Sequence, residues 1–184
     1  MTGQVIWLTG LSGAGKTTVA EKLNQQLRDR GLQPVLLDGD ILRNILKKPD
    51  QMSGTYTREA RVELALKYAH ICKFLSLQGF NVIIATVSMF QEVYAWNRAN
   101  FPNYFEIYLK VPLEELRLRD PKRIYQRYDA GEISNVAGLD LLIDEPFGSN
   151  VILDFKTHSF LWKNPTDIVN YLISELEFST CLLK

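Results

Sequence analysis

The 184-residue sequence has few of the residues that build disulfide or metal frameworks. Its two cysteines, Cys72 and Cys181, show no Cys-x-x-Cys spacing, and neither His70 nor His158 has a second metal ligand at helical spacing. A disulfide scaffold and a metal cage made by the protein are therefore not expected. Two thiols without a pairing pattern favour a reducing, cytoplasmic location.

An excess of charge of one sign is also lacking. Lysine plus arginine and aspartate plus glutamate both number 21, so the formal net charge is zero. Without an overall basic field, a nucleic-acid or membrane partner is not expected. No apolar run approaches the roughly 20 residues that cross a bilayer, and the first residues lack the pattern of a secretory leader.

What the sequence does contain is a composition of 46% hydrophobic and 23% charged residues, which is typical of a domain with a well-buried core. Its length suits a single domain, residues 1–184. Apolar runs of strand length alternate with helical stretches, which predicts an α/β fold: a central parallel β-sheet flanked by helices on both faces. The expected strands are Val5–Thr9, Pro34–Leu37, Asn81–Val87, Tyr104–Val111 and Val151–Leu153, and the expected helices are Thr17–Arg30, Arg58–Gln78, Gln91–Asn100, Leu113–Arg119 and Thr166–Phe178.

The stretch Asp120–Ser149 differs from the rest of the chain. It is less apolar, contains Gly131, Gly138 and Gly148, and lies between the fourth and fifth expected strands. Long connections of this kind in a compact domain are commonly functional. We therefore interpret residues 120–149 as a mobile lid.

The segment that begins at Gly10 and ends at Thr17 matches the phosphate-binding P-loop pattern, and it follows an apolar strand and opens an amphipathic helix. Its N–H groups and the helix start would hold the phosphates of ATP. Lys16 would reach the β- and γ-phosphates, and Thr17 would give a hydroxyl to Mg²⁺. A plain turn with a solvated lysine is the alternative, although a lysine at a helix start is unfavourable without an anion. The predicted nucleotide-binding residues are Gly10, Ser12, Gly13, Ala14, Gly15, Lys16, Thr17 and Thr18.

Two carboxylates, Asp38 and Asp40, flank Gly39 at the end of the second expected strand. Ligands of open α/β sheets bind beyond the carboxyl ends of the strands, so both should face the same crevice as the P-loop. For phosphoryl transfer to an alcohol, one of the two carboxylates can accept the hydroxyl proton while the other helps to hold Mg²⁺ through water. The alternative is a structural turn in which Asp40 caps the helix that begins near Ile41. Arg43 either faces an anionic acceptor or lies on the surface.

Further short segments carry a resemblance to a known family: Trp7-Leu-Thr-Gly-Leu-Ser-Gly, Arg119-Asp-Pro-Lys122, Ala130-Gly-Glu-Ile133 and Gly138-x-Asp140, with Tyr125 and Asn135 between them. Together with the P-loop and the acidic strand end, they resemble adenylylsulfate kinase, which phosphorylates the ribose 3′-hydroxyl of adenylyl sulfate. The resemblance runs from about residue 5 to residue 154. Its segment from Asp-Pro-Lys to Gly-x-Asp is not a general feature of P-loop kinases.

The resemblance implies a P-loop NTPase fold, ATP with Mg²⁺ as cofactors, a small nucleotide as acceptor, and a homodimer. It also implies the general-base role for Asp40 and contacts to the acceptor from Arg43, Arg61 and Ser88. Lys122 would approach the phosphates from the lid. For Arg61 the alternative is a place on a solvated, charged helix face.

Departures from the family pattern gather where the acceptor base would lie. Tyr56 aligns with one of two phenylalanines that sandwich the base, but Val136 stands at the other, and Leu64 replaces an asparagine. Ser88 is kept in the strand-end segment Thr86–Met89. The alternative for Tyr56 is an ordinary loop aromatic. These differences keep open another nucleotide with the same ribose chemistry, as in related kinases of surface-polysaccharide gene clusters, including cytidine diphosphoramidate kinase.

The sequence therefore predicts an ATP-dependent kinase of the adenylylsulfate kinase type, which phosphorylates the ribose 3′-hydroxyl of adenylyl sulfate. The alternative is the same chemistry on another nucleotide, such as cytidine diphosphoramidate. An ATP-binding switch protein is an alternative from another class, but the retention of Lys16, Thr17, Asp38 and Asp40 argues against lost catalysis. A nucleoside monophosphate kinase would phosphorylate a phosphate instead of a hydroxyl group.

Overall fold

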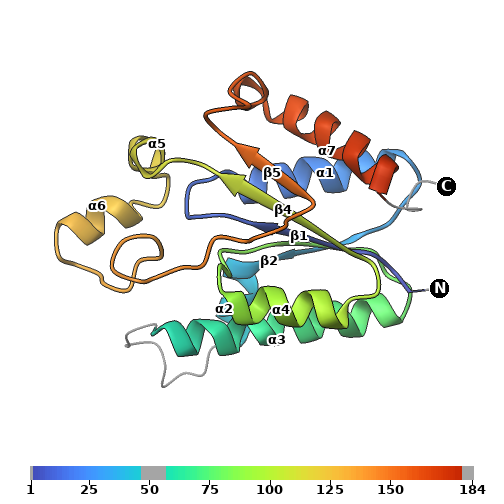
Figure 1. The fold of residues 1–184 in the computed structure, drawn as a ribbon, viewed down its shortest axis with the longest axis horizontal. Helices are drawn as coiled ribbons and strands as arrows, with labels where there is room; N and C mark the ends of the chain where they lie inside the picture. Colours follow the sequence, from blue (N-terminus) through green and yellow to red (C-terminus); the bar gives the residue numbers. More distant parts are fainter. Residues whose placement is uncertain (1, 47–56, 180–184) are drawn as a thin grey trace.

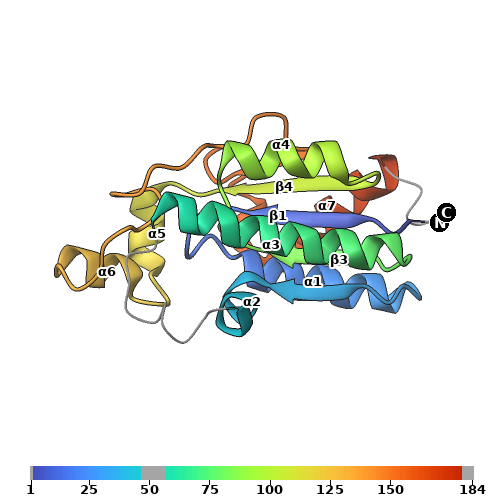
Figure 2. The ribbon, with the colours of Figure 1, turned by 90° about the horizontal axis from the view of Figure 1, so that it is seen from below.

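The computed structural model describes residues 2–46 and 57–179. A five-stranded sheet lies at the centre, with the strand order β2-β3-β1-β4-β5, and every pair of neighbours is parallel. Helices lie on both sides of it (Figures 1 and 2). The strands are β1 (Val5–Thr9), β2 (Val35–Asp38), β3 (Val82–Ala85), β4 (Tyr104–Lys110) and β5 (Val151–Asp154).

Two groups of helices cover the sheet. Figure 1 shows α1 and α7 on one face and α2, α3 and α4 on the other, while α5 and α6 extend beyond the carboxyl end of β4. None of the described helices is long and apolar enough to span a membrane. The helices are α1 (Lys16–Asp29), α2 (Gly39–Leu46), α3 (Arg58–Leu77), α4 (Gln91–Asn100), α5 (Leu113–Arg119), α6 (Ile124–Asp129) and α7 (Pro165–Ser179), with a short 3₁₀ turn at Leu161–Lys163.

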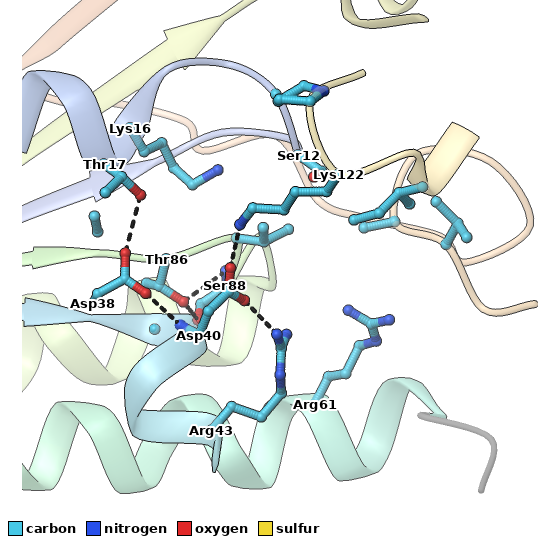
Figure 3. A pocket seen from close by; sticks show the side chains of 18 of the residues that line it. Ser12, Lys16, Thr17, Asp38, Asp40, Arg43, Arg61, Thr86, Ser88 and Lys122 are labelled. Atoms are coloured by element: carbon cyan, nitrogen blue, oxygen red, sulfur yellow. Dashed lines mark hydrogen bonds and ion pairs between the residues drawn. The ribbon is translucent and has the colours of Figure 1, made fainter. Parts of the chain in front are cut away.

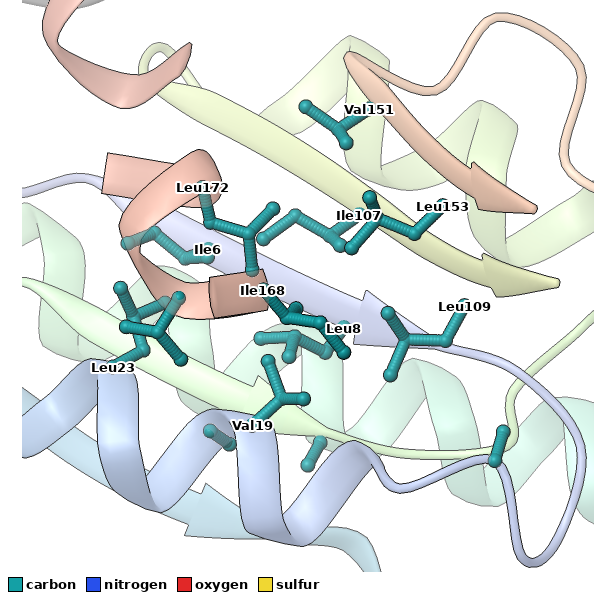
Figure 4. Close-up of a cluster of buried hydrophobic side chains, with 14 of the residues drawn as sticks. Ile6, Leu8, Val19, Leu23, Ile107, Leu109, Val151, Leu153, Ile168 and Leu172 are labelled. Atoms are coloured by element: carbon teal, nitrogen blue, oxygen red, sulfur yellow. The ribbon is translucent and has the colours of Figure 1, made fainter. Parts of the chain in front are cut away.

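Each face of the sheet has its own hydrophobic core. Alternate residues of a strand point to opposite faces, so Ile6 and Leu8 of β1 pack with α1 and α7, as Figure 4 shows. Val5 and Trp7 pack with α3 and α4 on the other side. All five residues of β1 are buried, because a central parallel strand is covered on both faces.

The architecture confirms the predicted α/β fold with a parallel sheet between two layers of helices. Strand β1 and helices α4 and α5 have the predicted bounds, and the other predicted elements differ by one or two residues at their ends. The largest difference concerns the third strand, which ends at Ala85 instead of Val87. Beyond Ala85 the backbone leaves the sheet and forms a wall of the site described next.

Candidate active site

The segments that follow β1, β2, β3 and β4 enclose one cavity of about 740 Å³. Figure 3 shows charged side chains from several of these segments pointing into it. Basic side chains outnumber the carboxylates of Asp38 and Asp40, so an anionic ligand is favoured electrostatically. The basic residues that line the cavity are Lys16, Arg43, Arg61, Arg119, Lys122 and Arg127.

The predicted P-loop connects β1 to α1 and forms one wall of this cavity. Gly10 has a φ of 149°, and a Cβ atom there would lie 2.6 Å from the carbonyl oxygen of Leu109. Only glycine fits a position with both restrictions. Gly15, in the left-handed conformation, precedes α1, and no side chain caps the helix. The first N–H groups of α1 are thus not bonded by a capping side chain and suit a phosphate.

Lys16 points into the cavity from the first turn of α1 (Figure 3). Its Nζ donates a hydrogen bond to the carbonyl oxygen of Leu11 at 2.8 Å. Burial lowers the pKa of Lys16 to about 8, and the positive charge of Lys122 acts in the same direction. The nearby carboxylates of Asp38 and Asp40 act in the opposite direction. An anion in the cavity would restore the full charge of Lys16.

Asp38 joins the P-loop helix to the start of α2. Its Oδ2 accepts the hydroxyl of Thr17 at 3.0 Å, while its Oδ1 accepts the backbone N–H groups of Asp40 at 2.8 Å and Ile41 at 3.2 Å. Asp38 is therefore the residue that caps α2, and the alternative in which Asp40 is the cap is wrong. The helix begins at Gly39, two residues earlier than expected, because the capping carboxylate stands two residues earlier.

The carboxylate of Asp40 is held between two basic side chains. Arg43 donates to Oδ1 from one turn further along α2, and Lys122 donates to Oδ2 from the turn between α5 and α6. Burial raises the pKa of Asp40, but the Lys122 hydrogen bond and the charges of Arg43, Lys122 and Lys16 outweigh it, and the pKa lies below its usual value. Asp40 is therefore ionised at neutral pH, as a general base must be.

The predicted acceptor residues Arg61 and Ser88 both line the cavity. Arg61 donates to the carbonyl oxygen of Asn135 at 2.6 Å, and its pKa is lowered by burial and by Arg43. Arg61 therefore does not lie on a solvated, charged helix face, which was the alternative. The hydroxyl oxygens of Ser88 and Thr86 lie 2.8 Å apart in a hydrogen bond, and both residues are buried.

The predicted lid contributes Lys122 and Val136 to the cavity wall. Val136 is 6% exposed, and Asp140 fixes its backbone by accepting its N–H at 2.7 Å. A second contact ties the lid to the P-loop, since the hydroxyl of Tyr125 donates to the carbonyl oxygen of Ser12 at 2.9 Å. Tyr56, the predicted partner of Val136 in the base site, lies outside the described residues.

The cavity-wall residues that sequence reasoning missed include Tyr68, Thr86 and Phe90. Tyr68 lies within a long helix, and Phe90 immediately precedes another. Neither position belongs to a motif that sequence spacing could reveal. Thr86 directly follows β3, so the rule that ligands bind at strand ends could have identified it.

The cavity and its P-loop can be compared with known proteins. The Adenylylsulphate kinase family model matches residues 2–154. The cytidine diphosphoramidate kinase of Campylobacter jejuni is 43% identical over 148 residues, which cover 80% of this chain and 84% of the relative. The adenylyl-sulfate kinase of Pseudomonas aeruginosa is 36% identical over 175 residues, covering 94% and 85%. The solved structure of the Mycobacterium tuberculosis APS kinase in complex with AMPPNP and APS aligns with a TM-score of 0.83 at 27% identity, covering 96% and 98%.

Proposed function

This chain belongs to the adenylylsulfate kinase family, and from that membership we propose that it transfers the γ-phosphoryl group of ATP to a nucleotide ribose. The proposed acceptor is cytidine diphosphoramidate, and the phosphorylated group is the 3′-hydroxyl. The observation that carries the kinase chemistry is the placement of Asp40 opposite Lys16 and the P-loop in one cavity. An ionised carboxylate beside a phosphate-binding loop is what transfer to an alcohol requires.

The donor half of the site fits ATP with Mg²⁺. Thr17 and Asp38 bring a hydroxyl and a carboxylate to within 3.0 Å of each other, and such hard oxygen donors suit Mg²⁺. Thr17 and Asp38 would hold Mg²⁺, which would supply positive charge to neutralise the phosphates of ATP. Lys16 would exchange its hydrogen bond to Leu11 for one to the phosphates, which the loop N–H groups hold in place.

In the transfer step, the 3′-oxygen of the ribose forms a bond to the γ-phosphorus while the bond from that phosphorus to the bridging oxygen of ADP breaks. The hydroxyl proton passes to a lone pair on an oxygen of Asp40 that the hydrogen bond from Lys122 or Arg43 leaves free. Lys16 stabilises the charge that gathers on the transferred group. Most of the rate enhancement then comes from positioning and electrostatics.

The acceptor half of the site has a basic and an apolar part. Arg43 and Arg61 line it and would bind the anionic groups that follow the 5′-oxygen of the acceptor. Leu64, Val136 and Ala137 form an apolar wall. Adenylyl sulfate and cytidine diphosphoramidate both carry two linked anionic groups, so the arginines suit either one and the base must distinguish them.

Two observations favour the cytidine nucleotide. The Campylobacter jejuni relative that carries this activity in its name is 43% identical, against 36% for the Pseudomonas aeruginosa adenylyl-sulfate kinase. Val136 also places an aliphatic side chain in the cavity wall, at a position where the resemblance expects a phenylalanine, and the large ring system of adenine would gain less from it than from an aromatic face. Adenylyl sulfate is the second candidate, because the second relative matches more of the chain and the APS kinase structure has the same fold.

The experiment is product analysis after incubation with Mg·ATP and each acceptor. We expect ADP release that depends on the acceptor, and mass spectrometric fragmentation that places the new phosphate on the ribose. A switch protein would release ADP slowly whether or not an acceptor is present. A phosphate on the terminal group would indicate a nucleoside monophosphate type of kinase. A homodimer in a cytoplasmic location is part of this proposal, and light scattering would test the dimer.

A further inference from the structure

Gly39, the residue between the two carboxylates, is held from two sides. A Cβ atom built on Gly39 would lie 2.9 Å from Oγ1 of Thr86 and 3.1 Å from the carbonyl oxygen of Ala85. The start of α2 therefore packs directly against the end of β3, with no room for a side chain between them. From the other side, the hydroxyl of Tyr68 donates a hydrogen bond to the carbonyl oxygen of Gly39 at 3.0 Å.

Tyr68 is well suited to fix the position of another residue. It lies in α3 and is 4% exposed, and it belongs to the hydrophobic cluster that packs α3 onto the sheet. Its ring is thus placed by the core and not by the cavity. Burial raises the pKa of its hydroxyl well above the usual value, so the group remains a hydrogen-bond donor at every pH at which the protein would work.

We propose that Tyr68 is a positioning residue, which holds Gly39 against Thr86 and thereby fixes the adjacent carboxylate of Asp40 in its catalytic position. The inference rests on the proposed function of Asp40 as the base. Asp40 follows Gly39 directly, so a shift of the Gly39 peptide moves Asp40 relative to the phosphates. Displacements of about 1 Å in such sites lower turnover by up to about 100-fold.

Tyr68 also lines the cavity, so direct contact with the acceptor is the competing role. The two roles predict different kinetics. A residue that acts through Asp40 changes kcat, because a base contributes in the transition state, whereas a residue that binds the acceptor mainly changes the acceptor KM. The hydroxyl bond to Gly39 favours the first role, since it occupies the one proton that the phenol can donate.

Tyr68→Phe removes the hydroxyl and keeps the ring in the core. A matched control is Tyr94→Phe, because Tyr94 is also a buried phenol and donates to a backbone carbonyl oxygen, that of Asp144, at 3.2 Å. We expect Tyr68→Phe to lower kcat about tenfold with the KM values for ATP and acceptor nearly unchanged. Tyr94→Phe should leave kcat within about twofold. A raised acceptor KM at normal kcat would assign Tyr68 to substrate binding and overturn the proposal.

A double-mutant cycle tests whether the effect of Tyr68→Phe on kcat depends on Asp40. If Tyr68 acts through this carboxylate, Tyr68→Phe has little further effect on the residual kcat of Asp40→Asn. An equal loss of kcat in both backgrounds would overturn the proposal.

A second readout needs no acceptor and so separates this inference from the proposed function. A shift of the Gly39 peptide would move the Asp40 carboxylate relative to Lys16. Crystal structures of the two variants should therefore show Asp40 displaced in Tyr68→Phe and unmoved in Tyr94→Phe. An unmoved Asp40 in Tyr68→Phe would contradict the positioning role. Failure of the proposed function would instead appear as wild-type protein without acceptor-dependent ADP release.

Discussion

Lys122 and Asp40 form an ion pair across the cavity, although 82 residues separate them in the sequence. The contact joins the predicted lid to the proposed base. Arg43 donates to the other oxygen of the same carboxylate, so each oxygen accepts a hydrogen bond from one basic side chain and keeps a lone pair for the acceptor hydroxyl. Of the two basic side chains, Lys122 is the more exposed.

Replacing Lys122 should change the pH dependence of turnover. Lys122→Met removes a hydrogen bond and a charge that lower the pKa of Asp40, while the burial that raises it remains. Since Asp40 must be ionised to act as a base, activity is lost as the pH falls through its pKa. The acid limb of kcat/KM for the acceptor should therefore move to higher pH in Lys122→Met. The exposed control Lys156→Met should keep the wild-type limb, and an unmoved limb in both variants would contradict the ion pair.

Binding of ATP should take up a proton at alkaline pH. The pKa of Lys16 is lowered to about 8 by burial and by Lys122, and phosphates beside its ammonium group should raise it again. Below that pH Lys16 is already charged, whereas above it each binding event must protonate Lys16. Calorimetry in buffers of different ionisation enthalpy should show this uptake, and affinity should fall by up to about tenfold per pH unit above the pKa. An affinity for ATP that does not change with pH between about 7 and 9 would exclude this proton uptake by Lys16.

The lysine of the P-loop should be necessary for turnover but not for folding. Lys16→Ala removes a charge that stabilises the transferred group, for which a loss of about 100-fold or more in kcat is expected. The matched control is Lys22→Ala, an exposed lysine on the same helix. Circular dichroism should show native helix content for both variants. Full acceptor-dependent ADP release by folded Lys16→Ala would remove the assignment of the donor site.

The sequence contains enough information to predict the sheet, the P-loop and the acidic strand end, because each depends on local patterns. Strand-length apolar runs identify β1 to β5, and the glycine spacing before Lys16 identifies the phosphate loop. That Asp38 and Lys16 share one cavity follows from the rule for strand ends in parallel sheets. These predictions needed no knowledge of distant contacts.

The remaining features depend on local backbone geometry or on contacts between residues far apart in the chain. An aspartate at either position, Asp38 or Asp40, could cap α2 by accepting its first N–H groups. Which of them does so depends on the backbone conformation of that single turn. The hydrogen bond from Tyr68 to Gly39 depends on how α3 packs against the start of α2. Nothing in the spacing of residues around Tyr68 marks it as different from any other aromatic residue of an amphipathic helix.

The two carboxylates should have separable roles. Asp40→Asn removes the base and should lower kcat far more than it raises the KM for ATP. In Asp38→Asn the asparagine can still cap α2 through its oxygen, while the charge beside Thr17 is lost and an NH₂ group replaces the oxygen that accepts the Thr17 hydroxyl. This variant should need more Mg²⁺ for half-maximal activity. Wild-type rates for both variants across a Mg²⁺ titration would show that Asp38 and Asp40 have only a structural role.

Enlarging the residue at the base wall should affect the two acceptors differently. Val136→Phe adds an aromatic face worth about 1–3 kcal/mol of stacking to a base that can use it. If cytidine diphosphoramidate is the natural acceptor, the ring should obstruct it and lower its kcat/KM, while kcat/KM for adenylyl sulfate rises. Because Val136 is buried, thermal unfolding of the variant is the necessary control. An adenylyl sulfate activity that is high in the wild type and unaffected by the ring would contradict the role of Val136.

The most direct measurement of the central claim is kcat/KM of the wild-type protein for cytidine diphosphoramidate and for adenylyl sulfate, in parallel at saturating Mg·ATP. Identification of the 3′-phosphorylated product by mass spectrometry accompanies each assay. We predict transfer to the ribose of both nucleotides, with the higher kcat/KM for cytidine diphosphoramidate. A higher value for adenylyl sulfate would contradict the proposed acceptor, and the absence of a phosphorylated product from either nucleotide would contradict the proposed kinase activity on these acceptors.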